Sequence, residues 1–72
     1  MARKKRSSLF RHQLLELLAQ GLPLGEIAAK LNRSVGTVRQ TLYLMRQSAE
    51  ARSTVQLVVM YREDALPKNF RI

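Results

Sequence analysis

The sequence predicts a mostly α-helical fold, in which a three-helix core containing a helix-turn-helix is followed by an apolar C-terminal segment. Three observations lead to this prediction. Apolar residues recur every three or four positions between residues 9 and 49, as on the buried face of a helix. Residues that cap or end helices separate these runs. The 72-residue chain has no cysteine, so one small core without disulfides is expected.

The first helix is expected from about Leu9 to Ala19. Ser8 is predicted to cap it, because a serine hydroxyl can accept from the free N–H groups of the first turn. Gly21 follows the helix and suits a left-handed cap. Before it, residues 1–7 carry four basic side chains and are predicted to be a disordered arm. The buried stripe of the helix is expected to be Phe10, Leu14, Leu17 and Leu18.

The second and third helices are separated by a three-residue turn, residues 32–34. Pro23 is predicted as the first residue of the second helix, where a missing N–H costs nothing. Asn32 tolerates the left-handed conformation that such a turn needs, and Ser34 is a good N-cap for the third helix, which should end near Ala49. The inward-facing residues are expected to be Ile27, Ala28 and Leu31 on the second helix and Val38, Leu42 and Met45 on the third.

The last third of the chain allows two readings. Residues 54–61 are rich in β-branched and aromatic side chains, which favours a strand, and residues 69–72 could pair with it as a hairpin. A fourth helix capped by Ser53 is the alternative. Five consecutive apolar residues, 57–61, are too many for so small a core, so segment 51–72 is predicted to mediate dimerisation. It follows the helix-turn-helix unit, which is placed at residues 8–50. The interface residues are expected to be Val55, Leu57, Val58, Val59, Met60 and Tyr61.

The charge balance points to a polyanionic partner. Thirteen Lys and Arg against five Asp and Glu give a net charge of +8. No apolar run approaches the ~20 residues that span a bilayer, so a cytoplasmic protein with no membrane partner is expected. His12 has no partner for a metal, and no cofactor is expected. Ser8, His12 and Glu16 would lie open to water on one helix face, so an enzyme is not expected.

Two helices joined by a short turn, with polar residues facing outward on the second, are typical of a helix-turn-helix that reads the major groove. Arg39 can donate two hydrogen bonds to guanine, and Gln40 can form two hydrogen bonds with adenine. A methyl group of Val35 or Thr37 can contact the methyl group of thymine. Gly36 would allow close approach. The predicted base-reading residues are Val35, Gly36, Arg39, Gln40 and Tyr43. The predicted phosphate-binding residues are Lys30, Arg33, Ser34, Thr37 and Arg46, with Arg3, Lys4, Lys5 and Arg6 of the arm, whose alternative role is a solvated tail.

Residues 14–42 resemble the LuxR/GerE-type helix-turn-helix of bacterial transcription regulators. The resemblance is carried by LLAQGL at 17–22, EIA at 26–28, Leu31, Ser34, TVR at 37–39 and Leu42. It implies that the third helix reads the major groove and that a fourth helix pairs subunits. By position, it implies that Arg39, Gln40 and Tyr43 are base readers and that Thr37 contacts the DNA backbone.

The function expected from these observations is sequence-specific binding of double-stranded DNA by a small repressor. A homodimer would bind an inverted repeat with half-sites about 10 bp apart. Two alternatives come from other classes. One is a phage-type interaction protein that docks on a host protein such as RNA polymerase, with DNA contact secondary. The other is a cationic peptide that folds on an anionic membrane surface.

Overall fold

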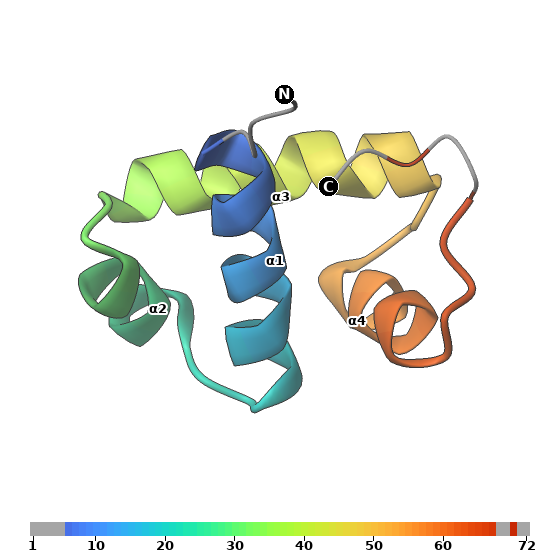
Figure 1. Cartoon of the computed structure of the whole chain (residues 1–72), viewed down its shortest axis with the longest axis horizontal. Helices are drawn as coiled ribbons and strands as arrows, with labels where there is room; N and C mark the ends of the chain where they lie inside the picture. Colours follow the sequence, from blue (N-terminus) through green and yellow to red (C-terminus); the bar gives the residue numbers. More distant parts are fainter. Residues whose placement is uncertain (1–5, 68–69, 71–72) are drawn as a thin grey trace, which may run out of the picture.

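The described part of the chain folds into four helices that pack around one core. The structure, a computed structural model, describes residues 6–67 and 70, with side chains from Leu9 onward. The helices are α1 (Arg6–Ala19), α2 (Leu24–Leu31), α3 (Val35–Ala49) and α4 (Thr54–Arg62). The longest helix, α3, crosses behind α1, while α2 and α4 lie on either side of α1 (Figure 1). Both α2 and α4 contact α1 and α3. The predicted mostly helical fold is therefore confirmed.

The core takes side chains from all four helices. Leu15, which the predicted stripe of the first helix leaves out, is fully buried, whereas Leu17 and Leu18 are only partly buried. The reason is that α1 is flanked by α2 on one side and α4 on the other, so it buries a face wider than a single stripe. The buried residues are Phe10, Leu14, Leu15, Ile27, Ala28, Val38, Leu42, Met45, Ala49 and Leu57.

All four helices end in the same way. A residue with a left-handed backbone follows each helix, and the next N–H donates to the carbonyl five residues earlier, which satisfies a free carbonyl of the last turn. The left-handed residues are Gly21 (φ 89°), Asn32 (58°), Glu50 (58°) and Asp64 (56°). The N–H to O bonds are Leu22 to Leu17 (3.3 Å), Arg33 to Ala28 (2.9 Å), Ala51 to Arg46 (2.9 Å) and Ala65 to Met60 (2.8 Å). The conformations predicted for Gly21 and Asn32 are confirmed.

At the helix starts, one of the predicted positions is confirmed and others differ. Ser34 caps α3 as predicted, with its Oγ accepting from the N–H of Thr37 at 3.1 Å. Pro23 occupies the cap position of α2 rather than its first helical position.

The predicted start of the first helix after Ser8 is wrong, because α1 already begins at Arg6. Arginine and serine do not break a helix, and extending an existing helix by a few residues costs little. Residue 6 and residue 7 therefore belong to α1, and not to a disordered arm. Arg3, Lys4 and Lys5 lie outside the described residues.

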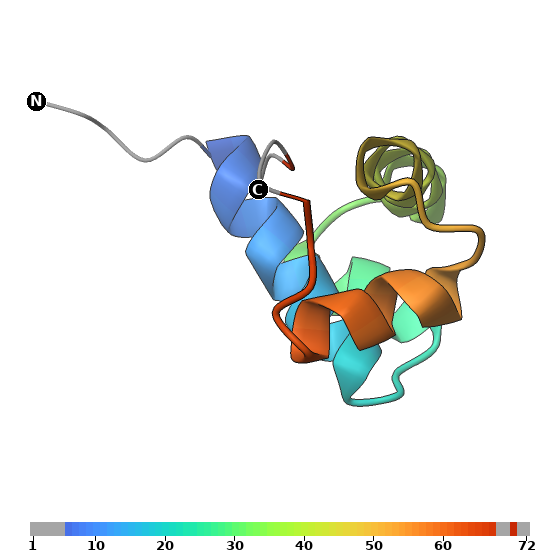
Figure 2. The ribbon, with the colours of Figure 1, turned by 90° about the vertical axis from the view of Figure 1, so that its right-hand side faces the viewer.

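The C-terminal segment is helical at residues 54–62, and the described part of the chain contains no strand. Ser53 caps this helix, its Oγ accepting from the N–H of Gln56 at 3.0 Å, and Leu57 is buried in the core. Packing and capping thus override the β preference of the valines. Figure 2 shows α3 nearly end-on, with α4 running across below it. Phe70, predicted to join a hairpin, packs against the core instead.

The described helices are too short or too polar to cross a membrane.

Candidate nucleic-acid interface

The helix-turn-helix places one face of α3 against the core and leaves the opposite face uncovered. Val38 and Leu42 on α3 are buried together with Ile27 and Ala28 on α2. This packing fixes the rotation of α3 about its own axis, so the opposite side points away from the protein. The five predicted base-reading residues, Val35, Gly36, Arg39, Gln40 and Tyr43, are all exposed, as are Lys30, Arg33, Ser34 and Thr37.

Four of the predicted base readers share one groove. The groove runs over α3 between Leu24, the first residue of α2, and Thr54, the first residue of α4. The starts of two other helices therefore flank the exposed side of α3. The α3 residues that line it are Gly36, Arg39, Gln40, Leu42, Tyr43 and Arg46. Val35 is exposed but does not line the groove.

The charged side chains of residues 27–49 are all basic, although Glu26 lies just before this segment, in the first turn of α2. Residues 27–49 contain four basic side chains and no acidic one. The five acids of the chain lie elsewhere, in α1, in the first turn of α2 and at the ends of α3 and α4. A surface of one sign raises the local concentration of an oppositely charged partner. The four basic residues are Lys30, Arg33, Arg39 and Arg46.

The fold itself does not require glycine at position 36. A Cβ placed there would meet only Ser34 Oγ, at 3.9 Å, which is an ordinary contact. Glycine inside a helix costs about 1 kcal/mol relative to alanine. Close approach of a partner to the start of α3 would be one use for a glycine at this position.

The two hydroxyls at the start of α3 are paired with each other. Ser34 Oγ lies 2.9 Å from Thr37 Oγ1 and also accepts from the N–H of Thr37. Either hydroxyl can donate within this pair, so the hydrogen of the other stays available for an outside acceptor such as a phosphate oxygen.

Two of the predicted phosphate ligands have partners inside the protein. The guanidinium of Arg33 lies 4.6 Å from the centre of the Phe10 ring, a cation–π contact that leaves the side chain exposed. Arg46 Nη2 donates to the carbonyl of Arg52 at 2.7 Å, and its buried Nε has no partner among the described residues. Gln56 Oε1 accepts from the N–H of Arg52 at 2.7 Å. Arg46 therefore helps to hold the α3–α4 loop rather than pointing freely outward.

The sequence analysis missed Gln47. Its side chain is exposed, and its Nε2 donates to Tyr43 Oη at 3.0 Å. It follows Tyr43 by four residues and Gln40 by seven, so all three lie on the same side of α3. That spacing is the signal in the sequence by which it could have been found.

The predicted dimer interface is wrong for Leu57, which is fully buried in the core of the single chain and is therefore not accessible to a partner. Val58, Met60 and Tyr61 are partly buried. Val55 and Val59, by contrast, are 73% and 44% exposed. The part of this segment that is free to contact a second copy is thus centred on two valines, one helical turn apart.

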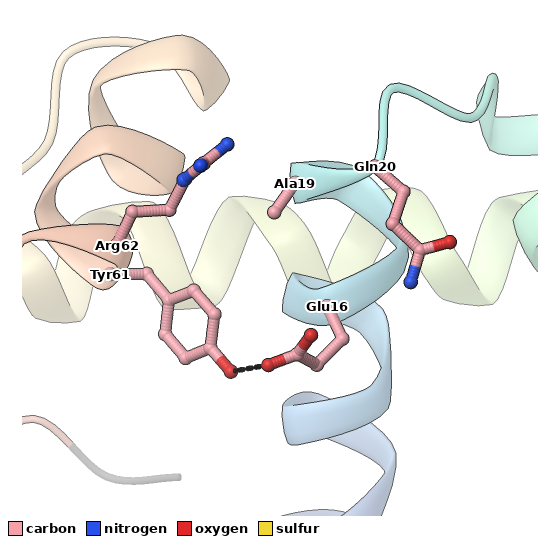
Figure 3. A pocket seen from close by; sticks show the side chains of 5 residues that line it. All are labelled: Glu16, Ala19, Gln20, Tyr61 and Arg62. Atoms are coloured by element: carbon pink, nitrogen blue, oxygen red, sulfur yellow. Dashed lines mark hydrogen bonds between the residues drawn. The ribbon is translucent and has the colours of Figure 1, made fainter.

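Tyr61 connects α4 to α1. Its Oη donates to Glu16 Oε2 at 2.5 Å, and the two side chains point toward each other across an open pocket also lined by Ala19, Gln20 and Arg62 (Figure 3). This hydrogen bond, followed by burial and the negative charge of Glu16, raises the pKa of Tyr61 above its ordinary value. The contact holds the C-terminal end of α4 against α1.

No family model matches this chain, and neither a curated protein nor a solved structure matches it. The arguments for its function therefore come from the helix-turn-helix geometry, the groove over α3 and the chemistry of the residues that line it.

Proposed function

We propose that this protein is a sequence-specific, double-stranded DNA-binding transcription regulator of the LuxR/GerE type, with α3 inserted in the major groove. The observation that carries the proposal is the groove over α3, where Gly36, Arg39, Gln40 and Tyr43 lie uncovered. They occupy a helix whose other side is fixed by the core. The major groove of B-DNA admits an α-helix and displays a distinct donor and acceptor pattern for each base pair.

The surrounding residues suit the contacts to the DNA backbone. Lys30 and Arg33 are exposed cations beside the turn, and the paired hydroxyls of Ser34 and Thr37 leave one hydrogen to donate. Such contacts fix the position of a protein on the duplex, while the side chains at base edges carry the specificity. Arg39 is assigned to guanine in this arrangement.

The exposed valines of α4 support a homodimer. Val55 and Val59 form an apolar strip that a second copy would cover. Specific interfaces bury about 800 Å² on each partner, which is far more than two valines offer. The dimer is therefore weak in free solution and assembles on an inverted repeat whose half-sites lie about 10 bp apart. Such a protein, acting in the cytoplasm, represses by occupying a promoter.

The test is selection of bound duplexes from a random pool by the purified protein at physiological salt. An enriched inverted repeat is expected. Arg39→Ala should cost about 1–3 kcal/mol and relax the preference at one position. Arg62→Ala, on α4 and away from the groove, removes the same charge and should leave the enriched sequence unchanged. Tight binding without any enriched sequence would contradict the proposal.

A second candidate function is docking on a host protein such as RNA polymerase. A mostly apolar groove between α1 and α2 favours it, lined by His12, Gln13, Glu16, Leu17, Lys30 and Leu31. This function predicts binding to purified RNA polymerase in the absence of DNA, which Gln13→Arg should weaken and Arg39→Ala should not.

A further inference from the structure

The outward side of α3 carries a line of residues without charge. Gly36, Gln40, Tyr43 and Gln47 follow one another at spacings of four, three and four residues, so they lie along one strip of the helix surface. All of them are exposed. The strip therefore presents one phenol and two amides, which recognise a partner by hydrogen bonds rather than by charge.

Tyr43 holds the amide of Gln47 in position. Gln47 Nε2 donates to Tyr43 Oη at 3.0 Å. An amide has two N–H donors and an oxygen that can accept two bonds, so Gln47 keeps one N–H and its oxygen for a partner outside the chain. With the amide turned over, Tyr43 would donate to the oxygen, and a donor and an acceptor would still remain.

One donor beside one acceptor is complementary to adenine. In the major groove, adenine presents N7 as an acceptor and its N6 amino group as a donor, and glutamine pairs with both. Guanine presents two acceptors there, for which the fork of arginine is the usual partner. Arg39 lies to one side of the strip, nearer to the buried face of α3. The centre of α3 thus fits A·T pairs better than G·C pairs.

We propose that Gln40 and Gln47 each read an adenine, so that every half-site contains two A·T pairs contacted by α3. This inference rests on the proposed function. The two residues are separated by about 10.5 Å along the helix axis, and base pairs stack about 3.4 Å apart. The two A·T pairs are therefore no more than about three base-pair steps apart. Gly36, with no side chain, adds no bulk between the start of α3 and the duplex.

The experiment compares four proteins in the random-pool selection: the wild type, Gln40→Glu, Gln47→Glu and Gln13→Glu. Each variant changes one exposed glutamine and adds one negative charge, so the change in net charge is matched. Gln13 on α1 lines a different groove and serves as the control. Circular dichroism and a thermal melt verify that each variant is folded before the selection.

The wild type is expected to enrich two A·T positions in each half-site. Because a carboxylate accepts from the amino group of cytosine, Gln47→Glu should change the preferred base from adenine to cytosine at one of them, by about tenfold or more. Gln40→Glu should do so at the other, and Gln13→Glu at neither. An enriched site whose bases are unchanged in Gln47→Glu would overturn this inference and leave the proposed function standing. No enriched site for the wild type would overturn both.

Tyr43→Phe tests whether the Tyr43 hydroxyl positions Gln47 for base recognition. It removes the hydroxyl that holds Gln47 and leaves Gln40 untouched. We expect the adenine preference to fall at the Gln47 position alone. An equal fall at both positions would overturn the assigned positioning role of Tyr43.

Discussion

The outer faces of α3 and α4 are both left uncovered by the chain, yet they differ in chemistry. On α3 most of the exposed side chains are polar, with Gln40, Tyr43 and Gln47 along the centre, although Val35 and Leu44 are also exposed, at 37% and 46%. On α4 they include Val55 at 73% exposure and Val59 at 44%. The polar groups on α3 are hydrogen-bonded to water when no partner is present. The valines of α4, by contrast, are stabilised when their surface is removed from water.

Under the proposed function, the two faces suit two kinds of partner. The polar face suits a ligand with its own ordered donors and acceptors, such as the base edges of DNA. The apolar face suits another apolar surface, although two valines offer too little area for a strong interface. Specificity is therefore expected to come from α3, and α4 to add cooperativity between half-sites.

The largest expected effect is a loss of stability on substitution at the buried side of α4, compared with its exposed side. Leu57→Ala should lower the free energy of unfolding by about 2–5 kcal/mol, because it leaves a cavity in the core. Val55→Ala should change it by no more than about 0.5 kcal/mol. Urea unfolding followed by circular dichroism measures both. A small loss for Leu57→Ala would mean that α4 is not part of the core.

A second prediction concerns the connection between the two faces. Arg46→Met removes the hydrogen bond to the Arg52 carbonyl, which holds the α3–α4 loop, and should cost about 1–2 kcal/mol. Arg39→Met, on the exposed face of the same helix, should cost no more than about 0.5 kcal/mol. Equal stability of the two variants in urea would return Arg46 to the role of a phosphate ligand alone.

The helix-turn-helix could be predicted from the sequence because its signals are local. Ser34 and Asn32 specify the end of one helix and the start of the next within three residues. The state of residues 54–62 could not be decided, because their composition favours a strand while the capping by Ser53 and the burial of Leu57 favour a helix. Only the packing against α1 and α3 determines which preference dominates.

The same distinction applies to the site. The exposure of Arg39 and Gln40 follows from helical spacing relative to Val38 and Leu42, and it was predictable. The internal bonds of Ser34 and Arg46 were not, because they depend on a hydroxyl rotamer and on the position of a loop. Sequence patterns therefore find which side of a helix is free, and not which of its polar groups are already used.

A third prediction compares the caps of α3 and α4. Ser34→Ala and Ser53→Ala should each lower stability by about 1 kcal/mol, because each removes an acceptor from a first-turn N–H. Ser8→Ala is the matched control, since Ser8 lies within α1 and not at its start. It should leave stability within about 0.5 kcal/mol of the wild type. A loss at Ser8 equal to that at Ser34 would restore Ser8 as the cap of the first helix.

The smallest effect is a pH dependence located at the contact between α4 and α1. The hydrogen bond from Tyr61 to Glu16 raises the pKa of the phenol above its ordinary value of 10.0. In the unfolded chain the phenol loses its proton near pH 10, while the folded state keeps it to a higher pH. The stabilisation is therefore complete below pH 10 and is lost as the pH rises through the folded-state pKa. Between about pH 9 and about pH 11, the wild type should lose more free energy of unfolding than Tyr61→Phe, measured by urea titration at each pH. Parallel losses in the two proteins would mean that the hydrogen bond from Tyr61 to Glu16 does not help to hold α4 to α1.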